Sequence, residues 1–198
     1  MKPRQMDLTE GSVKQKTERS KKMMVVVLLF SLFMGFAGLT SAYLVSQKRE
    51  DWMSSIQLPD AFLYGLLIIA LSSVTYILAG RFLKSNDGQK TLLLLGITLV
   101  LGIAFIFIQF EGFKSLIQDG NYLTGDTANI KSSFIYVIAV AHIVHVVAGL
   151  ISLGWVTVNQ YLGKYTSESH LGFSLGAIFW HFLGGLWLYL YLFMYFFQ

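Results

Sequence analysis

The sequence predicts an all-α protein, a polytopic membrane bundle of five transmembrane helices. The 198 residues are 55% hydrophobic and 13% charged, whereas globular domains carry about 25% charged residues. Five apolar runs each reach the length of about 20 residues that crosses a bilayer as a helix. Of the 15 basic and 11 acidic side chains, only Arg81 and Glu111 lie inside these runs. An ordinary soluble domain, a disordered tail and a nucleic-acid-binding protein are therefore excluded.

The predicted spans are apolar nearly all round, whereas a soluble core helix keeps a polar stripe. They cover about residues 23–45, 61–83, 91–113, 132–159 and 172–197, and they form one domain, 23–198. Residues 1–22 are polar and lack periodicity, so we expect a cytoplasmic N-terminal tail there. The first run is too long for a signal peptide, and no small-residue cleavage site follows it, so we expect it to be retained as a helix.

The connections between the runs predict neighbours and orientation. The short segment 84–90 makes the second and third spans antiparallel neighbours. Asp119-Gly120-Asn121-Tyr122 is a turn signal before the fourth span. With the N-terminus inside, the inner segments carry eleven basic residues and the outer ones four. Because basic residues concentrate on the cytoplasmic side, we predict an N-in, C-out orientation.

Polar side chains inside a span are candidate functional residues, because each raises the free energy unless it finds a partner. His142 and His145 lie three residues apart on one helix face, and His181 lies in the last span. Gln109 and Glu111 lie at the outer end of the third span. We expect the histidines to be neutral, with ring N–H groups that bond across helices. Glu111 is expected to reach water at the interface and stay ionised.

Haem and metal binding by these histidines are the weaker interpretations. His142 and His145 share one helix face, so they cannot be the two opposed axial ligands of one haem. A metal site would need a further ligand beside the His-x-x-His pair, and His181 is the available one, with no acidic partner nearby in the sequence. The chain has no cysteine, which excludes disulfides and iron–sulfur clusters. We expect no catalytic residue, cofactor or metal in this chain.

Several short motifs follow one another in the order found in a known membrane-protein family. They are Asp119-Gly120-Asn121-Tyr122; Ala141-His142-Ile143-Val144-His145-Val146 with Gly149; and His170-Leu171-Gly172-Phe173-Ser174 followed by Phe179-Trp180-His181-Phe182 and Trp187. From about residue 25 to its end, the chain resembles subunit III of the haem–copper terminal oxidases. In that family the last two motifs read His-Phe-Gly-Phe-Glu and Tyr-Trp-His-Phe-Val-Asp.

The resemblance implies a five-helix form of a subunit that usually has seven helices. It further implies a non-catalytic subunit of cytochrome c oxidase, which reduces oxygen to water and pumps protons in the respiratory chain. Haems and copper are then expected in partner subunits, with subunit I and phospholipids as contacts and the bacterial plasma (inner) membrane as location. His142, His145, Trp180, His181, Gln109 and Glu111 are candidate structural, lipid or interface contacts.

Three alternatives remain open at this stage. Subunit III of a quinol oxidase fits the same motifs. A small transporter or channel would need polar residues along a path through the bundle, and the spans have almost none. A free-standing b-type cytochrome would need haem bound by the histidines.

The chain departs from the family pattern at its buried acids. Leu32, Ser174 and Gly184 stand where the family has Glu, Glu and Asp. Glu111 is displaced by one residue relative to the family's Gln-x-x-Glu, which is about 100° around a helix. We therefore expect support of the oxidase by packing and lipid contact, with little scope for proton movement.

Overall fold

The computed structural model describes residues 12–50, 52, 56–125 and 129–197, and it confirms the predicted five-helix, all-α architecture. The helices are α1 (Val13–Ser46), α2 (Asp60–Lys84), α3 (Gly88–Gln118), α4 (Ile130–Tyr161) and α5 (Leu171–Phe196). No strand occurs in these described ranges. Each helix is long and apolar enough to cross a membrane. The N-in, C-out orientation stays a prediction.

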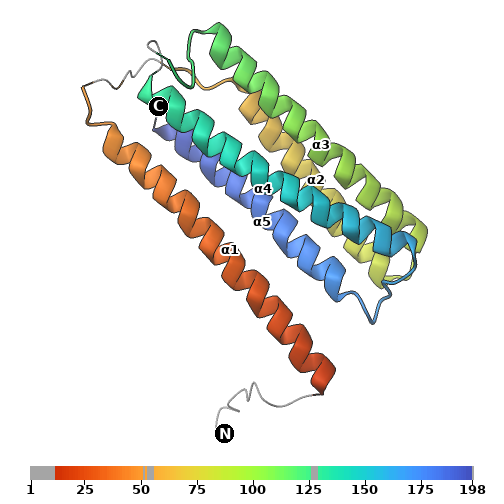
Figure 1. Ribbon diagram of the computed structural model, residues 1–198. Coiled ribbons are helices and arrows are strands. Elements are labelled where there is room, and N and C mark those ends of the chain that lie inside the picture. The colour runs from red at the N-terminus through yellow and green to blue at the C-terminus, as the bar shows by residue number, and fades with distance from the viewer. Residues whose placement is uncertain (1–11, 51, 53–55, 126–128, 198) are drawn as a thin grey trace, which may run out of the picture.

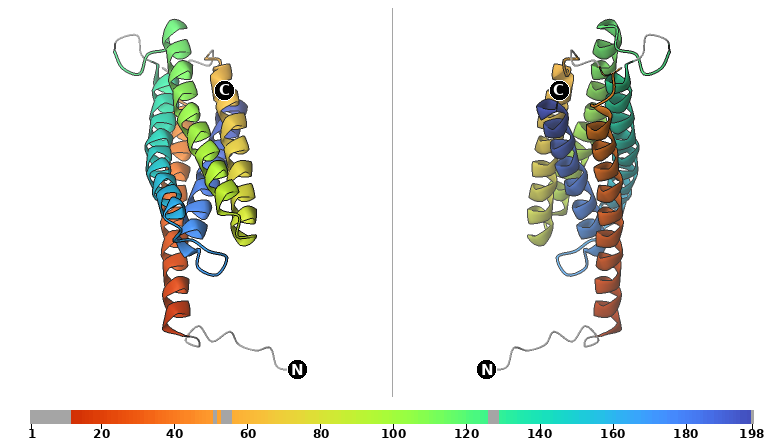
Figure 2. Two further views of the ribbon diagram at one scale, coloured as in Figure 1. Left: turned by 90° about the vertical axis from the view of Figure 1, so that its right-hand side faces the viewer. Right: turned by 90° about the vertical axis from the view of Figure 1, so that its left-hand side faces the viewer.

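Helices α2, α3, α4 and α5 form a closed bundle, and α1 lies on its outside (Figure 1). In that bundle α2 packs on α3, α3 on α4, α4 on α5, and α5 back on α2. The pairing of α2 with α3 is the most extensive, as the short connection between them predicts. Helix α1 contacts α4 and α5, and it extends beyond the other helices at its N-terminal end (Figure 2).

Helices α2, α3 and α4 each end in a turn with one left-handed residue. These residues are Asn86 (φ 57°), Gly120 (φ 78°) and Gly163 (φ 68°). At the end of α3, the Asn121 N–H donates to the Leu116 carbonyl at 2.9 Å, and equivalent bonds close the other two ends. This geometry is the Schellman motif, which favours glycine or asparagine. The turn predicted at 119–122 is therefore present.

Helix α1 begins at Val13, ten residues before the start of the predicted span. Ser12 and Gln15 form a capping box in which the Ser12 hydroxyl accepts from the Gln15 N–H, and the Gln15 side chain accepts from the Ser12 N–H. The lysine, glutamine, glutamate and arginine residues that follow are good helix formers, although their polarity hides this from a hydropathy pattern. Residues 1–11 of the predicted tail lie outside the described residues, so the division into tail and domain stays a prediction.

Helix α1 is fastened to the bundle through its C-terminal half. The Thr40 and Tyr189 hydroxyls lie 2.9 Å apart, and the Tyr43 hydroxyl donates to the Phe197 carbonyl at 2.8 Å. Nearer its N-terminus, α1 exposes more than half of the surface of Val27 and Phe30. This exposed apolar face is what a lipid or protein partner would cover.

The core of the four-helix bundle closes around the indole of Trp180 on α5. The Trp180 Nε1–H donates to the Ser72 hydroxyl of α2 at 3.0 Å. A Cβ on Gly102 of α3 would lie 2.5 Å from the ring, and one on Gly149 of α4 would lie 3.4 Å from it. The ring therefore fills the space that Gly102 leaves on α3, packs at ordinary contact distance against Gly149 of α4, and hydrogen-bonds to α2. We call Trp180, Ser72, Gly102 and Gly149 the Trp180 centre.

We predict that Gly102→Ala destabilises the fold by about 1–3 kcal/mol, because the added methyl group would overlap the buried indole. The measurement is the thermal midpoint of helix loss, followed by circular dichroism in detergent. Gly96→Ala on the same helix is the matched control, because nothing lies within 4 Å of its Cβ position. Equal midpoints for the two variants would contradict the assigned contact.

Candidate functional site

The sequence-predicted residues Trp180 and His181 lie side by side on α5 but point to different surroundings. Trp180 is 1% exposed and occupies the Trp180 centre. The His181 ring is partly exposed and packs against Tyr76 of α2, with ring centroids 5.7 Å apart. Adjacent helix residues are about 100° apart around the axis, so Trp180 serves the core while His181 lies nearer its margin.

His142 of α4 is fully buried in an aromatic cage. Its ring stacks on Trp187 at a centroid distance of 5.0 Å and meets the edges of Phe105 and Phe36 at 5.9 and 6.2 Å. Neither ring nitrogen has a hydrogen-bond partner within the described part of the chain. The predicted cross-helix hydrogen bond is therefore wrong for His142, because the neighbouring helices present aromatic rings to it.

His145 also differs from the expectation. Its Nδ1 lies 2.7 Å from the Ala141 carbonyl, one turn earlier on the same helix. The imidazole packs against Phe36 of α1 at a centroid distance of 5.6 Å. The predicted bond to another helix is wrong here as well, because the residue's own helix supplies an acceptor. His142 and His145 share a neighbour in Phe36, which places α1 over this face of α4.

Gln109 and Glu111 lie on opposite sides of α3. Gln109 is fully buried, and neither of its side-chain amide atoms has a partner among the described residues. Its Nε2 occupies the space beside Gly65 of α2 that a Cβ would fill. The Glu111 side chain is 63% exposed and pairs with Lys114. A separation of two residues turns a helix by about 200°, which explains why one side chain enters the core and the other leaves it.

The arrangement offers packing and polar contacts. In the described ranges, no three His, Cys, Asp or Glu side chains come together in a metal-binding group. What the sequence-based reasoning missed is the partnership of Trp180 with Ser72, Gly102 and Gly149. Small residues in the spans were the available signal, but their spacing does not show which side chain of another helix packs against each one.

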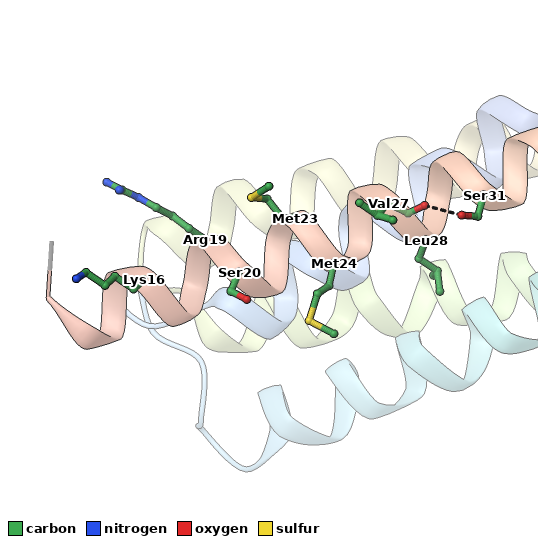
Figure 3. A pocket seen from close by; sticks show the side chains of 8 residues that line it. All are labelled: Lys16, Arg19, Ser20, Met23, Met24, Val27, Leu28 and Ser31. Carbon is green, nitrogen blue, oxygen red and sulfur yellow. Dashed lines mark hydrogen bonds between the residues drawn. The ribbon is translucent and has the colours of Figure 1, made fainter. Parts of the chain in front are cut away.

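A separate groove of about 860 Å³ runs along the N-terminal half of α1 (Figure 3). Figure 3 shows Lys16 and Arg19 near the start of the helix and Met24 and Leu28 further along. The Ser31 hydroxyl donates to the Val27 carbonyl of its own helix at 3.0 Å, so it adds little polarity to the groove. The groove is therefore basic at one end and apolar along its length.

The five-helix fold and the Trp180 centre define a multi-pass membrane protein whose described core consists of packing contacts between helices. The family model of cytochrome c oxidase subunit III matches residues 9–198. The chain belongs to the cytochrome c oxidase subunit III family, which confirms the resemblance noted in its motifs.

Similar proteins include a bacterial and several vertebrate members, all named cytochrome c oxidase subunit 3. The chain is 26% identical to the protein of Bacillus sp. (strain PS3) over 175 residues, which is 84% of this chain and 83% of that one. It is 31% identical to the Salmo salar protein and 32% identical to the Pan troglodytes protein, each over 131 residues. Those matches cover 65% of this chain and 47% of the relative, so the chain spans about half the length of these vertebrate relatives.

We predict that Ser72→Ala lowers the stability by about 1 kcal/mol, because the Trp180 Nε1–H loses its acceptor inside an apolar core. Ser73→Ala removes a hydroxyl next to it on the same helix and is the matched control. The measurement is the thermal midpoint in detergent. If both variants melt together, the interhelical bond contributes nothing measurable.

We predict that His142→Leu leaves the isolated chain as stable as before or stabilises it by about 1–2 kcal/mol, because an unpaired buried polar group is removed. His145→Leu serves as the comparison, and it should lower the midpoint because the bond to the Ala141 carbonyl is lost. Chemical unfolding followed by circular dichroism measures both. A clear loss of stability in His142→Leu would show that its ring is satisfied by a group other than the described residues.

Proposed function

We propose that this chain is the non-catalytic subunit III of a respiratory cytochrome c oxidase, an assembly that reduces oxygen to water and pumps protons. The observation that carries the proposal is the family match over residues 9–198. The bacterial relative named cytochrome c oxidase subunit 3, which is matched over 83% of its length, supports it. No comparison favours a quinol oxidase or a transporter.

In this role the chain acts as a scaffold beside the catalytic subunit I and as a contact for phospholipids. The exposed apolar face of α1, including Val27 at 62% and Phe30 at 65%, supports this role. So does a core in which Trp180 and His142 are enclosed by other side chains. We infer that the haems and copper reside in partner subunits, and that Trp180, His142, His145 and His181 position helices.

The distribution of acids supports a role without proton transfer through this chain. Glu111 lies at the surface beside Lys114, and Leu32, Ser174 and Gly184 stand at the family's acid positions in the spans. A proton relay within a membrane needs a chain of ionisable groups. We therefore assign packing and lipid contact to this subunit, in an N-in, C-out orientation in a bacterial plasma membrane.

The test is purification of the tagged full-length chain from its native membrane in mild detergent. We expect haem-containing subunits to copurify, with an a-type or related haem band in the visible spectrum. An unrelated tagged multi-pass protein from the same membranes controls for carry-over. Reduced cytochrome c and a quinol are then supplied in turn, and oxygen uptake with cytochrome c alone identifies the electron donor. The proposal would be overturned if the purified chain carried no haem, or if the ratio of haem to chain varied between preparations.

A further inference from the structure

The side of α1 opposite its buried residues forms a continuous open face. Phe36 and Thr40 are buried and contact α4 and α5, and Gly38 lies two residues from each of them, which is about 200° around the helix. The groove of about 860 Å³ along the N-terminal half lies on the same side as Gly38 (Figure 3). Its residues Ser31 and Val27 precede Gly38 by seven and eleven positions, close to whole numbers of turns. We call this side the outer face of α1.

The outer face is apolar in its first half and carries small residues in its second. Met24 and Val27 are 69% and 62% exposed. Further along, Gly35, Gly38 and Ala42 are exposed, and no described atom lies within 4 Å of the position that a Cβ would take at either glycine. Small residues three or four positions apart leave a shallow channel in which a second helix can approach closely.

Glycines inside the bundle show what such a channel accommodates. A Cβ at Gly102 would lie 2.5 Å from Trp180, and one at Gly112 would lie 2.7 Å from Phe62. In both cases the missing side chain makes room for a residue of a neighbouring helix. A glycine lowers the stability of a helix by about 1 kcal/mol relative to alanine, and lipid tails need no such space. The glycines of the outer face therefore indicate a helix that packs there.

The length of the outer face favours a helix over an acyl chain. From Lys16 to Ala42 the face runs about 39 Å at 1.5 Å per residue. The hydrocarbon core is about 30 Å thick, so one acyl chain would cover about half of it, whereas a membrane-spanning helix would cover the whole face. The hydrogen bonds that fasten α1 to the end of the bundle, from Thr40 and Tyr43, lie in its C-terminal half. A second helix along the outer face would support the N-terminal half as well.

The beginning of the outer face defines the chemistry of the partner. Lys16 and Arg19 lie three residues apart at the basic end of the groove, and both are exposed. The free N–H groups of a helix start favour acidic residues, yet the first turn of α1 contains none. The positive charges of the two side chains add to that of the helix start. An acidic side chain on the partner would therefore be attracted to this end.

We propose that the outer face of α1 docks a membrane-spanning helix of another oxidase subunit, with an aspartate or glutamate of that helix beside Lys16. The docked helix covers Met24 and Val27 and packs closely on Gly35 and Gly38. Charge complementarity at Lys16 and the two open glycines carry the assignment. It rests on the proposed function, because the partner belongs to the same assembly.

The experiment compares variants of the tagged full-length chain in the assembly purified from its native membrane. Gly38→Leu fills the channel, and Lys16→Glu reverses the charge at its start. Each should lower the ratio of haem to tagged chain after a detergent wash by about fivefold or more, because helices in a membrane associate through close packing and polar contacts. Circular dichroism should show the helicity of the unchanged chain for both variants, since no described atom lies within 4 Å of the Gly38 Cβ position and Lys16 is exposed.

The matched controls are Gly185→Leu and Lys164→Glu. A Cβ at Gly185 of α5 also has nothing within 4 Å, and Lys164 is exposed in the connection between α4 and α5. Both controls should keep the ratio of haem to chain within about twofold of the unchanged chain. An equal loss in the controls would assign the effect to a general disturbance and overturn the docking site.

Photo-cross-linking of the same assembly identifies the occupant, with benzoylphenylalanine incorporated in place of Val27. We expect a cross-link to one membrane-spanning segment of a partner subunit that carries an aspartate or glutamate near the end facing Lys16. No cross-link, or cross-links to lipid alone or to a second copy of this chain, would overturn the docking site. If the unchanged chain copurifies with haem and either Gly38→Leu or Lys16→Glu behaves as its control, this inference alone fails. An unchanged chain without haem would instead overturn the proposed function.

Discussion

The bundle depends on the Trp180 indole, which donates a hydrogen bond to the Ser72 hydroxyl and fills the space beside Gly102. Lipid tails are as apolar as leucine, so helices in a membrane associate through close packing and hydrogen bonds. Trp180 supplies both, because its ring fills the space beside Gly102 and packs against Gly149, while its N–H donates to Ser72 of α2. One side chain thus relates all four helices of the bundle to one another.

A further polar contact joins α2 and α3. The Thr98 hydroxyl donates to the Leu94 carbonyl of its own helix and also lies 2.8 Å from the Thr75 hydroxyl of α2. His142 and Gln109 stand apart, because their buried polar atoms have no partner among the described residues. Both occur in segments that resemble the family motifs.

Helix α1 is attached to the bundle near its C-terminal end and is exposed toward its N-terminus. Near its C-terminal end, Tyr43 and Thr40 tie the helix to α5 and the end of the chain. Toward its N-terminus the helix exposes apolar side chains, and the groove along this half has Lys16 and Arg19 at its basic end. A subunit proposed to hold a partner and lipids needs such a surface.

The sequence alone determined the number of helices, their apolar spans, the antiparallel pairing of α2 with α3 and the turn after α3. A helix that crosses the lipid needs a long run that is apolar all round, and the short connection between α2 and α3 makes these two helices neighbours. The predicted first span omitted the first turns of α1, because a hydropathy pattern does not detect polar residues that form helix. Helical periodicity placed His142 and His145 on one face, yet it could not show that rings, not acceptors, surround His142. Only the tertiary structure decided that Trp180 meets Ser72, 108 residues away, because packing across helices depends on rotations that no single span encodes.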